Sequence, residues 1–265
     1  MTVQTTSRDR VLWPQAGFTK GDMLDYYERV APALVPHVAG RPMTMRRFPE
    51  GVDGPSWFQD ECRGAPAWLR TVAARGRRLC VIDDTDALLW AANLSTIELH
   101  PYLWRIGDEE QATHLVFDLD PGEAATVVDC CAVALRIRAL VGGDARVKTS
   151  GLLGLHVLVS RLAPFAEAKG FAREVAEQLA AETPERVTAR QARPERRGKV
   201  LVDWLQNDAN RSTVAAYSLR AAPWPLVSTP VTWDEVERAR RPRELIFDAT
   251  AVLERLDRSG DLAVA

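Results

Sequence analysis

The chain has 265 residues, of which 46% are hydrophobic and 26% are charged, the ordinary balance of a globular protein with a full core. Its formal net charge of −2 excludes a protein that coats nucleic acid through bulk positive charge. No apolar run approaches the roughly 20 residues of a membrane span, and Met1–Arg10 has no signal-peptide core.

The four cysteines show no Cys-x-x-Cys spacing. The adjacent Cys130 and Cys131 fall in a helical pattern, where buried thiols are more common than metal ligands. We therefore expect a reduced, cytoplasmic compartment.

Helices are predicted where apolar residues recur at helical spacing after a capping residue, and strands where short apolar runs end at Gly, Pro or charged residues. In chain order, an irregular start over 1–18 precedes a helix over 20–37, strands over 43–48, 57–58 and 79–82, a helix over 85–94, and strands over 97–100 and 114–121. There follow a helix over 123–141, strands over 146–150 and 155–160, a helix over 164–182, a basic connection over 183–198, strands over 200–204 and 213–219, and helices over 233–240 and 242–256.

This intermixed order predicts an α/β fold with a mixed central sheet and flanking helices. We expect one domain over 1–265. On size grounds it can contain a smaller N-terminal subdomain over 1–105 and a catalytic core over 106–265.

The predicted strand over 114–121 ends in two acidic residues. Because side chains alternate along a strand, Asp118 and Asp120 point to one face and Leu119 points to the other, which we expect to be core. Two such carboxylates repel unless a cation lies between them, and Mg²⁺ or Mn²⁺ takes oxygen ligands of this kind. The alternative is a solvated turn before a helix, since Asp, Pro and Gly all favour turns.

Three further stretches carry polar groups at the ends of predicted strands. In 148–156, two glycines bracket a turn whose N–H groups could form an anion nest, with Ser150 and His156 as added donors; the alternative is an ordinary hairpin. Asp203 would supply a third carboxylate for two cations, or else caps the next turn. Arg220 could clamp a triphosphate, or is a surface arginine. His100 is a further phosphate or metal candidate.

The arginines gather in groups, at 46–47, 70–78, 190–199 and 238–243. Local basic patches on a neutral body suit an enzyme that grips a few phosphates. The alternative is that at least half of these groups are simply solvated faces.

Seven motifs occur in an order that resembles the polymerase domain of bacterial DNA ligase D, in the archaeo-eukaryotic primase superfamily. They are Val11-Leu-Trp-Pro14, Gly51-Val-Asp-Gly54, Ala92-Asn-Leu with Ile97-Glu-Leu-His-Pro101, Phe117-Asp-Leu-Asp-Pro-Gly122, Lys148-Thr-Ser-Gly with Gly-Leu-His156, Val202-Asp-Trp-Leu-Gln-Asn207 and Ala216-Tyr-Ser-Leu-Arg220. The resemblance spans roughly Arg10 to Leu245. No ligase or nuclease module is evident, so the chain resembles a stand-alone member.

The resemblance implies a primase-polymerase that adds nucleotides to a primer, with Mn²⁺ or Mg²⁺ and a preference for ribonucleotides. Asp118, Asp120 and Asp203 resemble the family's metal-binding carboxylates. Ser150, His156 and Arg220 resemble its triphosphate contacts, with His100 near them. Phe58 resembles the aromatic that stacks on the incoming base, a role open to any base because each has a π-face. The basic residues that resemble DNA contacts are Arg10, Lys20, Arg46 and Arg47.

The chain departs from the family pattern at three positions. Asp60 and Leu153 stand where the family commonly has Lys, and Ala216 where it commonly has Pro. Losing two cations near a phosphate site should weaken affinity for nucleotide or DNA, since each charge-assisted contact contributes about 1.5–3 kcal/mol.

We therefore predict a two-metal nucleotidyltransferase that acts on DNA and nucleoside triphosphates in repair or end joining. Ku and a separate ATP-dependent ligase are candidate partners, and the expected location is the bacterial cytoplasm at the nucleoid. One rival is a two-metal nuclease, in which the same carboxylates would position water. The other is a DNA-binding accessory paralogue whose catalysis has decayed, suggested by Asp60 and Leu153.

Overall fold

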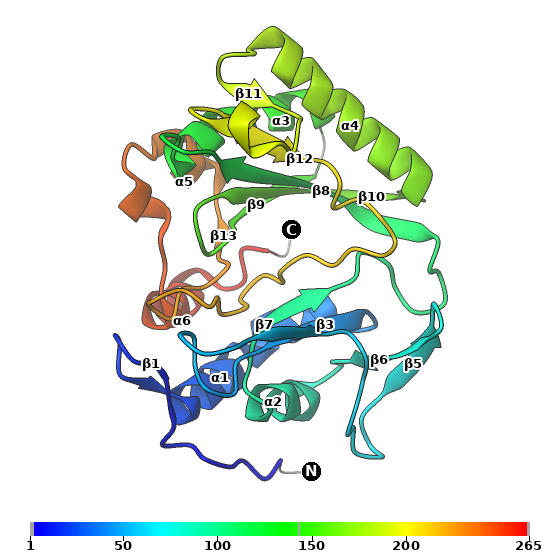
Figure 1. Cartoon of the computed structure of the whole chain (residues 1–265), viewed down its shortest axis with the longest axis vertical. Coiled ribbons are helices and arrows are strands. Elements are labelled where there is room, and N and C mark those ends of the chain that lie inside the picture. The colour runs from blue at the N-terminus through cyan, green and yellow to red at the C-terminus, as the bar shows by residue number, and fades with distance from the viewer. Residues whose placement is uncertain (1–2, 143, 264–265) are drawn as a thin grey trace. The chain divides into compact units, whose positions relative to one another are not determined.

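The computed structural model describes residues 3–142 and 144–263, which form two compact units (Figure 1). Unit 1 takes the described parts of Met1–Gly107, Ser212–Ser228 and Phe247–Asp261. Unit 2 takes those of Asp108–Arg211, Thr229–Ile246 and Leu262–Ala265. The chain thus leaves the first unit after Gly107 and returns to it twice.

Unit 2 is built on a six-stranded sheet. In spatial order the strands are β11 (Val187–Thr188), β12 (Val200–Asp203), β8 (Gln111–Pro121), β10 (Leu155–Pro164), β9 (Ala145–Thr149) and β13 (Pro230–Val231). Strands β11 and β12 are parallel and the other pairs are antiparallel, which confirms the predicted mixed sheet. Helices α3 (Val127–Val141) and α4 (Phe165–Glu182) pack against this sheet (Figure 1).

Strand β8 is the central element of unit 2. Its residues Leu115, Phe117 and Leu119 have no exposed surface, so the predicted core face is confirmed. Fully burying each such side chain stabilises the fold by about 1.5–3 kcal/mol. The alternate residues, including Asp118 and Asp120, therefore lie on the opposite face.

Unit 1 contains a second sheet. Strands β4 (Trp57–Gln59), β3 (Pro42–Arg47), β6 (Arg77–Val81) and β5 (Thr71–Ala74) follow one another, and β7 (Thr96–Pro101) also pairs with β3. Helices α1 (Lys20–Val38), α2 (Thr85–Asn93) and α6 (Ala249–Ser259) complete the unit with the short pair β1 (Val11–Trp13) and β2 (Phe18–Thr19). Helix α1 begins where predicted, because Thr19 and Asp22 form a reciprocal capping box.

Short helices complete the described chain: η1 (Arg193–Arg196), α5 (Trp233–Arg238) and η2 (Pro242–Leu245). Within residues 3–142 and 144–263, none of the helices has the length and apolar character needed to cross a membrane.

Three sequence predictions are wrong. Residues 213–219 are not a strand, because Tyr217 has a left-handed backbone (φ 66°) and the Ser218 N–H turns back to the Ala215 carbonyl. The predicted helix over 242–256 is two elements, since Asp248 caps a new helix by accepting from the Ala251 N–H. The irregular start contains the β1–β2 pair.

The cysteines also differ from expectation. Cys130 and Cys131 are buried free thiols, as predicted. Cys62 and Cys80, in contrast, form a disulfide with a Cα–Cα distance of 4.9 Å. The contact arises because the Cys62 N–H donates to the Arg78 carbonyl and draws this loop onto β6. Sequence spacing alone does not reveal such a pairing.

The turn before β10 lies so close to β8 that only glycine fits at position 154. A Cβ there would lie 2.0 Å from the Leu119 carbonyl oxygen, whereas a Cβ at Gly170 in α4 would meet no atom within 4 Å. We expect Gly154→Ala to lower the free energy of unfolding by about 1–3 kcal/mol. Gly170→Ala should raise it by about 0.5–1 kcal/mol. Urea unfolding of both variants tests this, and equal stabilities would contradict the close approach.

Candidate active site

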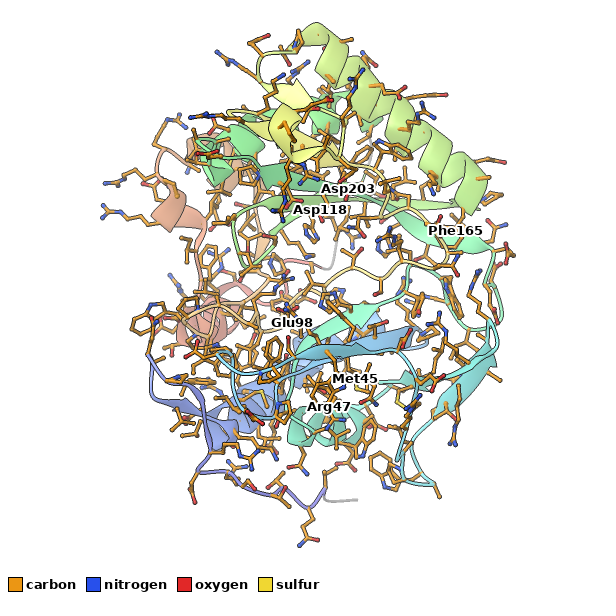
Figure 2. All side chains as sticks on the ribbon, in the orientation of Figure 1. Met45, Arg47, Glu98, Asp118, Phe165 and Asp203 are labelled. Atoms are coloured by element: carbon orange, nitrogen blue, oxygen red, sulfur yellow. A yellow bond between two sulfur atoms is a disulfide. The ribbon has the colours of Figure 1, made fainter. Side chains whose placement is uncertain are left out.

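Four ionisable side chains form a row across the sheet of unit 2. Asp118 on β8 lies directly opposite Asp203 on β12 and opposite His156 on β10, and His156 lies opposite Lys148 on β9. Residues directly opposite each other on antiparallel strands share a face. Asp120, two residues along β8, shares it too. Figure 2 shows Asp118 and Asp203 beside each other on neighbouring strands.

The electrostatics of this row favour a bound cation. Burial and the charge of Asp118 raise the pKa of Asp203, although the Leu205 N–H donates to its Oδ1 at 2.8 Å. His156 Nε2 lies 3.2 Å from Asp118 Oδ1. A neighbouring negative charge disfavours the ionised form of a carboxylate unless a positive ion intervenes.

The three carboxylates fit a hard divalent cation by their chemistry, because Mg²⁺ and Mn²⁺ prefer oxygen ligands. In the described ranges, no group of three or more His, Cys, Asp or Glu side chains is already gathered as a metal cluster. The row is therefore a set of facing donors on one side of the sheet.

The turn between β9 and β10 differs from the predicted anion nest. Ser150 Oγ accepts hydrogen bonds from the N–H groups of Leu152 (3.2 Å) and Gly154 (3.0 Å). Two amides that were expected to face an anion thus serve the turn itself. Ser150 is 7% exposed, and its hydroxyl holds the turn together through these two hydrogen bonds.

A second group of predicted residues lies in unit 1, around the buried Glu98 of β7. Its carboxylate contacts His100 Nε2 at 2.9 Å, Arg46 at 3.3 Å and Arg220 at 3.5 Å. Phe58 is 58% exposed. Its ring meets the His100 ring edge-on, with 5.5 Å between the two ring centroids. The structure thus gathers four predicted residues from four segments of the chain: Arg46 on β3, Phe58 on β4, His100 on β7 and Arg220.

Sequence reasoning missed Glu98 and Lys148. Both stand inside quoted motifs, but neither received a role. The period of two along a strand was a usable signal, since it places Glu98 on the same face as His100. Lys148 is 3% exposed, and only the pairing of β9 with β10 places it beside His156.

The predicted DNA contacts divide into separate places in unit 1. Arg10 and Lys20 lie together, since the Lys20 N–H donates to the Arg10 carbonyl. Burial and the charge of Arg10 lower the pKa of Lys20, so this pair favours an anion. Arg47 instead donates to the Leu94 carbonyl and to Gln59 and covers the Trp57 ring.

The structure shows the surroundings of Asp60 and Leu153, the two residues that stand where the family commonly has lysine. Asp60 forms an ion pair with Arg77 on β6, so its charge is already compensated. Leu153 is 73% exposed and lines a cavity of about 370 Å³ next to the start of α3. A leucine carries no charge, so no ion pair at position 153 takes the place of the lysine that the family commonly has there.

The chain matches the family model described as "LigD, primase-polymerase domain" over residues 19–263. It belongs to the LigD primase-polymerase family. The expected resemblance is therefore confirmed. The fold agrees as well: the chain has a TM-score of 0.89 and 38% identity to the solved polymerase domain from Mycobacterium tuberculosis ligase D in complex with DNA. That alignment covers 98% of this chain and 96% of the other.

The curated relatives are named as multifunctional end-joining proteins. The chain is 40% identical over 98% of its length to the multifunctional non-homologous end joining protein LigD of Mycolicibacterium smegmatis. It is 31% identical over 89% of its length to the protein of the same name from Pseudomonas aeruginosa. It spans 35% and 29% of these two proteins, so it corresponds to about a third of such a relative.

The nearby carboxylates predict that, without a bound cation, like-charge repulsion at the site lowers the free energy of unfolding. We expect Asp203→Asn to raise the free energy of unfolding by about 0.5–1 kcal/mol in EDTA, because it removes a like charge yet keeps the acceptor for the Leu205 N–H. Asp208→Asn is the matched control, because Asp208 pairs with Lys169 at 2.7 Å and its loss should destabilise. Denaturant unfolding that shows both variants destabilised alike would contradict the repulsion.

Proposed function

We propose that this chain is a DNA-dependent nucleotidyltransferase, a primase-polymerase that extends primers or fills short gaps. Its substrates would be nucleoside triphosphates, with ribonucleotides favoured, and its cofactors two Mn²⁺ or Mg²⁺ ions. The observation that carries the proposal is the row on the unit 2 sheet, where Asp118 lies between Asp203 and His156 with Asp120 on the same face.

Asp118, Asp120 and Asp203 would hold the metal ions. When bound, such ions lower the pKa of a primer hydroxyl and neutralise the pyrophosphate leaving group. His156 orients Asp118 through its Nε2. Ser150 holds the neighbouring turn in place through the two amide hydrogen bonds.

The unit 1 cluster supplies the groups that a nucleoside triphosphate requires. Arg220 is a donor for phosphate oxygens, and His100 becomes one when its ring is protonated, since its Nε2–H already serves Glu98. Phe58 exposes most of its ring, and Arg46 lies 5.2 Å from the ring centroid. A base could stack on such a ring whatever its identity, which suits a polymerase that accepts all four bases.

Arg10 and Lys20 would bind a phosphate of the DNA, and Arg46 and Arg47 would add positive charge on β3. The solved relative is a complex with DNA, which supports DNA as a partner here. The names of the relatives support a role in end joining. As part of the same proposal, Ku and a separate ATP-dependent ligase would be its partners, at the nucleoid in the bacterial cytoplasm.

The accessory-paralogue alternative is less well supported than the enzyme. It was motivated by Asp60 and Leu153, but Asp60 is compensated by Arg77. All three carboxylates are retained on one face, and a decayed catalyst has no need to keep this costly set.

Metal binding gives a readout independent of catalysis. At a Mn²⁺ concentration of 100 times its dissociation constant, binding should stabilise the protein by about 2.7 kcal/mol. We expect Mn²⁺ to raise the melting temperature of the wild type, and EDTA to reverse the rise. Asp118→Asn and Asp203→Asn should lose it, and Asp208→Asn should keep it. An equal rise in all four proteins would show that the ion binds elsewhere.

Primer extension tests the activity. On a short-gapped duplex with Mn²⁺, Asp118→Asn should lose at least roughly 100-fold in rate, because metal ligation supplies several kcal/mol of transition-state stabilisation. Asp208→Asn should extend normally. The same gel compares ribonucleotides with deoxyribonucleotides.

Two results would contradict the proposal. Normal extension by Asp118→Asn would remove the carboxylates from the reaction. Strand cleavage that needs no nucleoside triphosphate would favour the nuclease instead.

A further inference from the structure

Glu98 of unit 1 is a buried acid whose partners come mostly from outside its own sequence motif. Glu98 is 1% exposed, yet its carboxylate meets four donor groups. Oε2 lies 2.9 Å from His100 Nε2. Oε1 lies 3.3 Å from Arg46 Nη1 and 3.5 Å from Arg220 Nε, and accepts from the Ala221 N–H at 3.1 Å.

The strand register explains how one acid reaches this set. Glu98 on β7 lies opposite Arg46 on β3, and Arg46 lies opposite Phe58 on β4. The Arg46 guanidinium lies 5.2 Å from the Phe58 ring, and the same ring meets His100 edge-on. Figure 2 shows Glu98 on the sheet of unit 1, above Met45 and Arg47 in that view.

The carboxylate is ionised despite its burial. Burial by itself raises the pKa of Glu98, but the hydrogen bond from His100 and the charge of Arg220 bring it down to about 2. A buried charge persists only when it is paired and hydrogen-bonded, and here every partner is a group from the proposed nucleotide site or the backbone beside it.

We infer that Glu98 is a positioning residue for the incoming nucleoside triphosphate, which holds Arg220, His100 and, through Arg46, the Phe58 ring in their binding arrangement. This inference rests on the proposed function. Flexible arginine side chains lose rotamer entropy when they bind phosphate, and a buried counterion removes most of that cost in advance. The anion thus organises the site without contacting the substrate.

Two effects of Glu98→Gln oppose each other, which makes the test decisive. Removing a negative charge would by itself attract a triphosphate more strongly and lower KM. Losing the arrangement of Arg220 and His100 would raise KM. We expect the second effect to dominate, with KM for the nucleotide roughly tenfold higher, one decade of affinity. The kcat should stay within about twofold, since the carboxylates of unit 2 are untouched.

Two comparisons separate positioning from simple loss of structure. Glu182→Gln is the control, because Glu182 is an exposed acid paired with Arg136 in unit 2, and its KM should match the wild type. In an Arg220→Gln background, Glu98→Gln should change KM by less than about threefold, because the residue acts largely through Arg220. Circular dichroism and melting temperature are recorded for each variant.

Glu98→Asp covers the case in which Glu98→Gln does not fold. It keeps the charge and shortens the side chain by one methylene, so its KM should lie between those of the wild type and Glu98→Gln. A folded Glu98→Asp or Glu98→Gln with unchanged or lower KM, or a full tenfold effect in the Arg220→Gln background, would overturn the inference.

Failure of the proposed function would give a different result from failure of the positioning role. It would leave the wild type unable to extend a primer, and the comparison would then use the dissociation constant of a fluorescent nucleoside triphosphate. A wild type that binds the triphosphate more tightly than Glu98→Gln supports the positioning role even without extension. A wild type that neither extends nor binds overturns both.

Discussion

The register between β8 and its two neighbours is the constraint on which the candidate site depends. β8 pairs with β12 so that Asp118 faces Asp203, and with β10 so that Asp118 faces His156. A shift of one residue in either pairing would turn every side chain of the moved strand to the other face. The apolar set on the core face of β8, with no exposed surface, holds that register.

The two units have opposite electrostatic environments. In unit 2, acids lie together on one face of the sheet, where burial and the charge of Asp118 raise the pKa of Asp203 and favour a bound cation. In unit 1, cationic and donor side chains converge on a single buried acid, and the pKa of Glu98 falls to about 2. The proposed nucleotidyltransferase would use both kinds of environment, because a nucleoside triphosphate is a polyanion that binds together with metal ions.

Asp60 and Ser150 show that the structural surroundings of a residue determine its role. Asp60 reads as a reversed charge in the sequence, but Arg77 on β6 pairs with it. Ser150 reads as a phosphate donor, but its hydroxyl first accepts two amides of its own turn. Each residue is interpreted correctly only once its partners in the structure are known.

The sequence by itself determined the mixed α/β class, the boundaries of the capped helix α1 and the shared face of Asp118 and Asp120, because capping and strand alternation are local properties. It also placed the chain in its family through the order of its motifs. Only the tertiary structure decided that Asp203 faces Asp118, that Lys148 joins their row, that Glu98 contacts both Arg46 and Arg220 and that Cys62 meets Cys80. These are pairings across strands and loops distant in sequence, and burial of the whole core, rather than any local pattern, sets their register.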